Sequence, residues 1–189
     1  MKIGVLALQG AFREHRLMVE RCGVQAVEVR KPEQLADIDG LIIPGGESTT
    51  IGKLLNDWGL LEVIKTRAAT GMAIFGTCAG LILLAKDIVG SDQPRLGLMD
   101  IVAARNAFGR QRESFEADLQ VAELGDEPVR AVFIRAPQIE SAGAGVQVLA
   151  SVNDKAVIAR QGKLLVAAFH PELTTDDRLH RYFIRMIEE

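Results

Sequence analysis

Phe75-Gly76-Thr77-Cys78-Ala79-Gly80-Leu81 is the stretch of this sequence that decides its fold. It continues the apolar run 72–75 and leads into a second apolar stretch, so it predicts a buried strand that turns directly into a helix. Glycines on either side of Cys78 permit a sharp turn, as in the G-x-S-x-G nucleophile elbow, where a strained residue is lifted clear of the sheet. The segment therefore predicts an α/β fold with Cys78 at a strand end.

Short apolar runs alternate with amphipathic stretches through the first half of the chain. In the first predicted helix Phe12, His15, Val19 and Cys22 recur at helical spacing. Strands are predicted over 2–8, 24–29, 40–43 and 72–75, and helices over 12–22, 49–57 and 60–70. Continuous apolar strands joined by helices are typical of a parallel sheet that is covered on both faces. We expect a doubly wound, mostly parallel sheet with helices on both faces.

The second half of the chain has a different pattern. Strand-like segments with short polar turns are predicted over 100–104, 115–121, 129–134, 146–152, 156–160 and 164–169. They indicate some antiparallel pairing. The chain closes with a predicted helix over 175–187, in which Thr174 is the N-cap and Asp177 completes something close to a capping box. No linker, low-complexity tract or repeat separates the halves, so we expect residues 1–189 to form one domain.

Composition and charge argue against several classes of protein. The 22 Lys and Arg residues against 25 Asp and Glu leave no surplus positive charge for phosphates, which argues against a nucleic-acid partner. No apolar run approaches the roughly 18 residues that cross a bilayer. Two cysteines in unrelated contexts are typical of a reducing compartment, so we expect a soluble cytoplasmic protein. Without a metal-ligand cluster, a G-x-G-x-x-G motif or a Walker loop, we expect no metal and no cofactor.

Cys78 is the candidate nucleophile. A cysteine at a helix N-terminus lies at the positive end of the helix dipole, which favours the attacking thiolate. The N–H of Ala79 would be free to bind an oxyanion. The alternative is a small buried cysteine whose flanking glycines only allow close packing. Cys22, on the apolar side of a predicted helix, is interpreted as a buried structural thiol.

A thiolate nucleophile normally needs a histidine, and the sequence has three. His15 and His180 lie inside predicted helices, and we expect them at the surface or half-buried. His170 ends an apolar run and precedes Pro171, which favours extended geometry, so His170 and Glu172 can project to the same side. His170 and Glu172 are therefore the candidate base and acid. The alternative is a polar strand end with a turn proline.

The turn Pro44-Gly45-Gly46-Glu47-Ser48-Thr49-Thr50 follows another predicted buried strand. Its glycines would let the backbone approach a substrate, and the N–H of Gly46 is the simplest second oxyanion donor. The alternative is a helix N-cap formed by Ser48 or Thr49.

Chain order distinguishes between families, because the acid precedes the histidine in α/β-hydrolases but Glu172 follows His170 here. The motifs G-T-C-A-G and H-P-E on a doubly wound pattern resemble those of class I, triad-type glutamine amidotransferases. The resemblance narrows to the family of glutaminase subunits of pyridoxal 5'-phosphate synthases through I-G-V-L-A-L-Q-G-A-F-R-E-H (3–15), P-G-G-E-S-T-T (44–50), F-G-T-C-A-G-L (75–81), A-R-N-A-F-G-R-Q (104–111), F-I-R-A-P (133–137) and A-F-H-P-E-L (168–173).

The resemblance implies a glutaminase that hydrolyses L-glutamine through a γ-glutamyl thioester on Cys78. It implies that His170 moves the protons and Glu172 orients it, and that the oxyanion hole is formed by N–H groups of Gly46 and Ala79. It implies substrate binding by Gly46, Glu47, Ser48, Arg105, Ile134 and Arg135.

The resemblance also implies a partner, the barrel-fold subunit of pyridoxal 5'-phosphate synthase, because 189 residues leave no room for a second catalytic domain that would use the ammonia. Two alternatives stay open. One is another cysteine amidase or peptidase on the same scaffold, and the other is a non-catalytic regulatory subunit.

Overall fold

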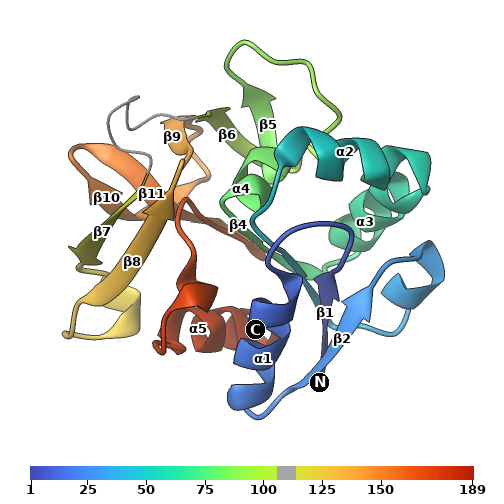
Figure 1. The fold of residues 1–189 in the computed structure, drawn as a ribbon, viewed down its shortest axis with the longest axis horizontal. Coiled ribbons are helices and arrows are strands. Elements are labelled where there is room, and N and C mark those ends of the chain that lie inside the picture. The colour runs from blue at the N-terminus through green and yellow to red at the C-terminus, as the bar shows by residue number, and fades with distance from the viewer. Residues whose placement is uncertain (106–113) are drawn as a thin grey trace.

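A computed structural model describes residues 1–105 and 114–189 of the chain (Figure 1). The strands are β1 (Lys2–Leu6), β2 (Gln25–Val29), β3 (Gly40–Ile43), β4 (Ala73–Thr77), β5 (Ala85–Ile88), β6 (Met99–Ala104), β7 (Ser114–Leu119), β8 (Val129–Ile134), β9 (Gln138–Ala142), β10 (Gln147–Val152), β11 (Lys155–Gln161) and β12 (Leu164–Ala167). The α-helices are α1 (Phe12–Arg21), α2 (Ser48–Asp57), α3 (Leu60–Ala69), α4 (Ala79–Leu84) and α5 (Arg178–Glu188). Short 3-10 helices are η1 (Pro32–Leu35), η2 (Ala122–Leu124) and η3 (Pro171–Leu173). None of the helices that the structure describes is long and apolar enough to span a membrane.

The first half of the chain builds the parallel part of the main sheet. Strands follow the order β2-β1-β3-β4-β12-β11-β9-β6-β5, and every pair from β2 to β12 is parallel. All residues of β3 and β4 are buried, because α1 and α5 cover one face and α2, α3 and α4 lie on the other (Figure 1). In β4, Phe75 packs on Phe183 of α5, whereas Gly76 faces α4. The predicted doubly wound α/β fold is confirmed.

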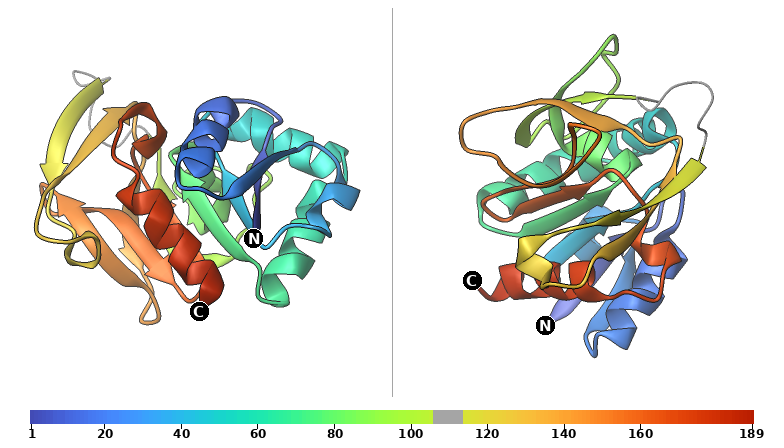
Figure 2. Two further views of the ribbon diagram at one scale, coloured as in Figure 1. Left: turned by 90° about the horizontal axis from the view of Figure 1, so that it is seen from below. Right: turned by 90° about the vertical axis from the view of Figure 1, so that its left-hand side faces the viewer.

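Antiparallel pairing in the second half is also confirmed. β11 pairs antiparallel with β9, β10 and β12, and β6 pairs antiparallel with β9. The separate β7–β8 sheet lies beside β10 at the end of the molecule far from β1 (Figure 2). The sequence patterns do not predict β5 or β9. β5 is an edge strand with exposed Lys86 and Asp87, and Ile139 is the one buried side chain of β9, so neither strand has an apolar signature.

The C-terminal helix begins later than predicted. α5 starts at Arg178, so the predicted N-cap at Thr174 and the start at residue 175 are wrong. The hydroxyl of Thr174 accepts a hydrogen bond from the N–H of Asp176 (3.2 Å), and the carboxylate of Asp176 accepts one from the N–H of Arg178 (3.0 Å). These local side-chain bonds satisfy the backbone in a non-helical turn and delay the helix.

His15 and His180 are fully buried, so the expectation that they lie at the surface or half-buried is wrong. Each lies on the sheet-facing side of its helix, and the ring of Phe75 packs edge-on against both, with centroids 6.3 Å from His15 and 5.7 Å from His180. In α1 the helical period that places Val19 in the core also places His15 there.

Gly80 allows α4 to approach β3 closely, and this contact generates a prediction. A methyl group at Gly80 would lie 2.2 Å from the carbonyl oxygen of Ile43, where backbone must shift. We expect Gly80→Ala to lower the free energy of unfolding by about 1–3 kcal/mol in urea denaturation. The matched control is Gly145→Ala, whose methyl group would meet the Gln161 side chain at 3.6 Å and should change stability by less than about 0.5 kcal/mol. Equal losses would contradict the prediction.

Candidate active site

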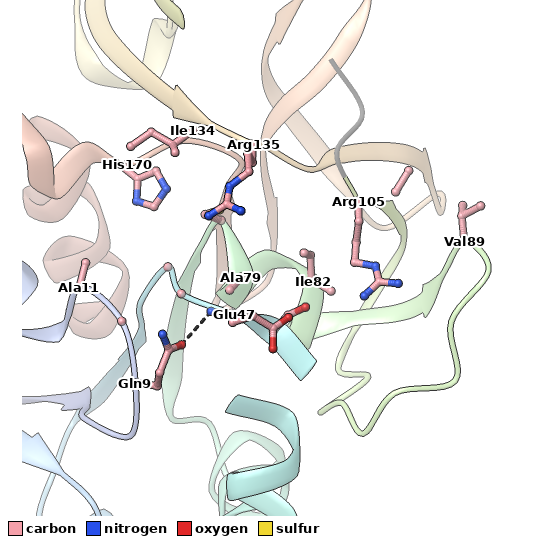
Figure 3. A pocket seen from close by; sticks show the side chains of 16 residues that line it. Gln9, Ala11, Glu47, Ala79, Ile82, Val89, Arg105, Ile134, Arg135 and His170 are labelled. Carbon is pink, nitrogen blue, oxygen red and sulfur yellow. Dashed lines mark hydrogen bonds between the residues drawn. The ribbon is translucent and has the colours of Figure 1, made fainter. Parts of the chain in front are cut away.

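The segments that follow four parallel strands enclose a cavity of about 800 Å³ (Figure 3). Residues 9–11 follow β1, residues 45–48 follow β3, Cys78 follows β4 and His170 follows β12. Open α/β sheets bind their ligands at this edge, outside the carboxyl ends of the strands. The cavity is lined by Gln9, Gly10, Ala11, Gly45, Gly46, Glu47, Ser48, Cys78, Ala79, Ile82, Val89, Ala104, Arg105, Ile134, Arg135 and His170.

Cys78 occupies the strained turn that the sequence predicts. Its φ of 49° and ψ of −99° form a conformation that is rare for a residue with a side chain. Its N–H donates to the carbonyl of Ala167 (2.8 Å), and its carbonyl accepts from the N–H of Leu81 (3.1 Å). The glycines also allow close packing, because added methyl groups at Gly76 and Gly80 would meet backbone at 2.6 Å and 2.2 Å. The strained turn at Cys78 and the close packing by its flanking glycines, which the sequence presented as alternatives, therefore occur together.

His170 and Glu172 lie together, as predicted. The N–H of His170 donates to the carbonyl of Val132 (2.9 Å), and its Nδ1 lies 2.7 Å from Oε1 of Glu172. Burial disfavours the imidazolium form, but hydrogen bonds to Cys78 and Glu172 outweigh burial and raise the pKa of His170 to about 10. His170 is therefore positively charged at neutral pH, between Cys78 and the Glu172 carboxylate.

Glu172 lies behind His170 and outside the lining of the cavity. Burial alone would raise the pKa of its carboxyl, but the neighbouring His15 and the hydrogen bond from His170 lower it. The carboxylate is therefore ionised at neutral pH and pairs with the His170 imidazolium.

The glycine turn after β3 packs directly against His170. An added methyl group would lie 2.4 Å from Cε1 of His170 at Gly45, and 2.4 Å from Oε1 of Gln9 at Gly46. The same oxygen of Gln9 accepts a hydrogen bond from the N–H of Glu47 (2.7 Å; Figure 3). The turn can lie here only because residues 45 and 46 lack side chains.

Glu47 caps helix α2. Its carboxylate accepts hydrogen bonds from the N–H and hydroxyl groups of Thr49 and Thr50, and these bonds, those from Thr49 first, lower the pKa of Glu47 to about 2. A cap by Ser48 or Thr49 is therefore wrong, because Glu47 is the N-cap and Ser48 begins the helix. The hydrogen-bonding capacity of the Glu47 carboxylate is therefore used by Thr49 and Thr50 of the same helix.

Two arginines reach the cavity from neighbouring segments (Figure 3). Arg105 directly follows β6, and its Nη1 lies 3.4 Å from Oε1 of Gln93. Arg135 follows Ile134 at the end of β8, in a strained conformation with a φ of 43°. Both side chains turn their guanidinium groups toward the cavity, which gives it positive charge. The motif at 104–111 lies outside the described residues from position 106 onward.

Sequence reasoning missed part of the cavity wall. The residues that it did not assign to the site are Gln9, Gly10, Ala11, Ile82, Val89 and Ala104. A polar Gln-Gly pair directly after a buried strand is the signal that could have found the first two. Gly10 has a φ of +101°, and a methyl group there would lie 1.9 Å from the carbonyl oxygen of Gly45. Ile82 and Val89 carry no such signal.

Cys22 does not line the cavity. It is half-buried at the C-cap of α1, so the prediction of a buried structural thiol is wrong, because the helix ends one residue before it. Burial, and then the nearby Asp177, raise the pKa of its thiol, so it is neutral at pH 7. In the described ranges no three His, Cys, Asp or Glu side chains are placed to hold a metal ion.

Comparisons with known proteins match almost the whole chain to one family. The model of the SNO glutamine amidotransferase family matches residues 5–189. A relative from Carboxydothermus hydrogenoformans, named pyridoxal 5'-phosphate synthase subunit PdxT, is 63% identical over 187 residues, which cover 99% of this chain and 98% of the relative. A relative of the same name from Pelotomaculum thermopropionicum is 65% identical, with 97% and 94% covered.

Solved structures with a similar fold also cover almost the whole chain. A crystal structure of a glutamine amidotransferase has a TM-score of 0.94 at 54% identity, with 99% of both chains covered. The structure of PurLQS from Thermotoga maritima has a TM-score of 0.76 at 16% identity, with 97% of both chains covered, and shares the fold alone.

The environment of His170 predicts an unusual titration. We expect its imidazole to stay protonated in an NMR titration well above neutral pH, and Cys78→Ala to lower its pKa toward the ordinary 6.5, with Cys22→Ala as the control. Because the folded-state pKa lies above the unfolded value, the resulting stabilisation is present below about pH 6.5 and is lost as the pH rises toward 10. A midpoint near 6.5 in the wild-type protein would contradict this interpretation.

Proposed function

Since the chain belongs to the SNO glutamine amidotransferase family, we propose that it is a glutaminase that hydrolyses L-glutamine to L-glutamate and ammonia. We propose that the ammonia passes to a separate synthase subunit that makes pyridoxal 5'-phosphate. The observation that carries the proposal is the hydrogen-bonded sequence of a strained Cys78, His170 and Glu172 at one cavity. The name shared by the relatives, synthase subunit PdxT, supports the second part.

In the first half of the proposed reaction, Sγ of Cys78 attacks the side-chain amide carbon of glutamine. The N–H groups of Gly46 and Ala79 bind the oxyanion of the tetrahedral intermediate. Ala79 suits this role because it is the first residue of α4, and the first N–H groups of a helix have no partner within it. The His170 imidazolium gives its proton to the departing nitrogen, so ammonia leaves and a γ-glutamyl thioester remains.

In the second half, the neutral His170 takes a proton from water, and the resulting hydroxide equivalent attacks the thioester carbonyl. Collapse of the second tetrahedral intermediate breaks the carbon–sulfur bond, so glutamate leaves and the Cys78 thiolate returns. Glu172 accepts the Nδ1–H of His170 throughout, which fixes the tautomer and stabilises each imidazolium. The raised pKa of His170 supports its role as the acid in the first half.

We propose that the substrate is held by Gly46, Glu47, Ser48, Arg105, Ile134 and Arg135, all of which line the cavity. A planar guanidinium can pair bidentately with the α-carboxylate of glutamine, which Arg105 and Arg135 are placed to offer. Glu47 contributes by shape, because its carboxylate caps α2 and its N–H is bonded to Gln9.

We also propose that residues 1–189 act as one glutaminase domain whose partner is the barrel-fold synthase subunit. The main sheet, which combines β1 to β5 of the first half with β6 and β9 to β12 of the second, supports a single unit. We propose the cytoplasm as its location, since both cysteines are free thiols.

The assignment of the nucleophile predicts that Cys78→Ala abolishes glutamate release, with a loss on the order of 10⁴ to 10⁶ in rate. Cys22→Ala removes the other thiol and should leave turnover largely intact, which makes it the matched control. Enzymatic detection of glutamate, with the synthase subunit present, measures both variants. If an electrophilic glutamine analogue labelled Cys22 in preference to Cys78, the assignment would be wrong.

The glycine turn predicts control by the partner. The backbone at Gly45 and Gly46 can turn at low cost, so the second oxyanion donor need not face the cavity until a neighbour fixes it. We expect glutamate release to rise about 10² to 10³-fold when a barrel-fold synthase subunit is titrated in, which is the effect of one oxyanion donor. Gly46→Pro deletes that N–H and adds a ring that would press on Gln9, so it should blunt the rise while calorimetry still detects binding.

If the isolated chain were fully active, and a partner that demonstrably binds did not change its activity, the proposed activation by the partner would be contradicted.

A further inference from the structure

Glu172 has two carboxylate oxygens, and the proposed mechanism uses one of them. Oε1 bonds to His170, whereas Oε2 is buried and makes no well-formed hydrogen bond among the described residues. Nε2 of His15 lies 3.3 Å from this oxygen, and neither side chain has exposed area. A buried carboxylate oxygen without a donor is costly, so a single N–H at this position has a large effect on where the carboxylate settles.

His15 belongs to a buried polar chain behind the cavity. Its Nε2 lies 3.0 Å from Oγ1 of Thr77, the residue before Cys78, and its Nδ1 lies 2.9 Å from Nε2 of His180. The chain therefore joins α1, β4, α5 and η3, and it reaches the Glu172 carboxylate at the oxygen that His170 does not contact. The two histidines are the buried ionisable groups of this region that the mechanism leaves without a role.

The contacts determine where the ring hydrogens lie. An unprotonated Nε2 on His15 would place its lone pair 3.3 Å from a buried oxygen of the Glu172 carboxylate, which is repulsive, so Nε2 carries the hydrogen. This N–H then donates to Oγ1 of Thr77 and lies beside Oε2 of Glu172. Nδ1 of His15 is then an acceptor, and Nε2–H of His180 donates to it. This assignment leaves only a lone pair at the buried, unpartnered Nδ1 of His180, whereas the reverse assignment would leave an N–H there.

Both rings are neutral. Burial lowers the pKa of His15 despite the opposing charge of Glu172. Burial, and then the neighbouring His15 ring, lower the pKa of His180 well below its ordinary value. A neutral donor holds the carboxylate in place without competing with the His170 imidazolium for its charge. His15 thus helps to orient the Glu172 carboxylate, and His170 provides the positive charge that pairs with it.

We propose that His15 is a positioning residue for Glu172. Its Nε2–H is bonded to Thr77, attracts Oε2 electrostatically across 3.3 Å and thereby keeps Oε1 on Nδ1 of His170, while His180 fixes the tautomer of His15. This inference rests on the proposed glutaminase function. The competing explanation is core filling, since Phe75 packs against both rings. An apolar residue of similar size could replace a core-filling histidine without loss of turnover, but it could not replace a donor.

Kinetics of the complex with the synthase subunit separates the two explanations. His15→Leu should lower kcat by about tenfold or more, because it removes the polar N–H beside a buried carboxylate oxygen, with KM for glutamine unchanged within about twofold. His15→Gln, whose amide N–H can reach toward Oε2, should restore most of kcat. Met18→Ala truncates a buried apolar residue of the same helix and controls for a loosened α1.

The outcomes are distinct. If the wild-type complex releases no glutamate, the proposed function fails and this inference fails with it. If the wild type is active but His15→Leu matches it, His15→Gln is no better than His15→Leu, or Met18→Ala loses as much kcat as His15→Leu, only the inference is overturned.

A measurement on the wild-type protein does not depend on any variant folding. The ring nitrogens of His15 and His180, assigned by their contacts with Phe75, are observed in a long-range ¹H–¹⁵N spectrum at pH 7. We expect both rings to be neutral with the hydrogen on Nε2. A hydrogen on Nδ1 of His15, or a doubly protonated ring, would overturn the proposal.

Discussion

The backbone strain at Cys78 is the constraint on which the rest of the site depends. A residue with a side chain in this conformation costs on the order of 1–3 kcal/mol and persists only where its surroundings fix it. Here the N–H is held by Ala167, the carbonyl by Leu81, and the flanking glycines bring α4 onto β3 and β4. The same closeness brings Gly45 against the imidazole of His170. The geometry of Cys78 and the packing of the sheet therefore cannot be changed independently.

The proposed chemistry explains the buried charges behind Cys78 better than a gain in stability over an apolar pair of the same size does. A buried imidazolium–carboxylate pair gains little net stability, because the loss of hydration offsets most of its attraction. In the proposed reaction, the His170–Glu172 pair provides a proton donor of fixed orientation beside the cavity. The neutral rings of His15 and His180 extend this pair into the core without adding charge. A third charged group in the same place would increase the cost of burial and would compete for the Glu172 carboxylate.

The sequence predicts most of the fold, because β3 and β4 are buried on both faces and their apolar runs are continuous. The sequence does not predict the edge strand β5, because its exposed residues Lys86 and Asp87 interrupt any apolar pattern. It predicts the start of α5 too early, because local hydrogen bonds at Thr174 hold a turn where the pattern indicates a helix. The candidates Cys78, His170 and Glu172 could be predicted because each carries a local signature of glycine or proline. The position of Gln9 in the cavity wall could not, because it depends on how closely the ends of β1 and β3 approach each other.

Strand register determines whether Cys78 and His170 lie close to each other. β12 pairs in parallel with β4, and Ala167 lies opposite Thr77, the residue before Cys78, although the two strands belong to opposite halves of the chain. A slip of one residue would turn every side chain of β12 to the other face of the sheet. The long apolar run that buries β12 on both faces does not by itself prevent such a slip. Two hydrogen bonds oppose the slip, one from the N–H of Cys78 to Ala167 and one from the N–H of His170 to Val132. Each fixes one residue of the site to a strand other than its own.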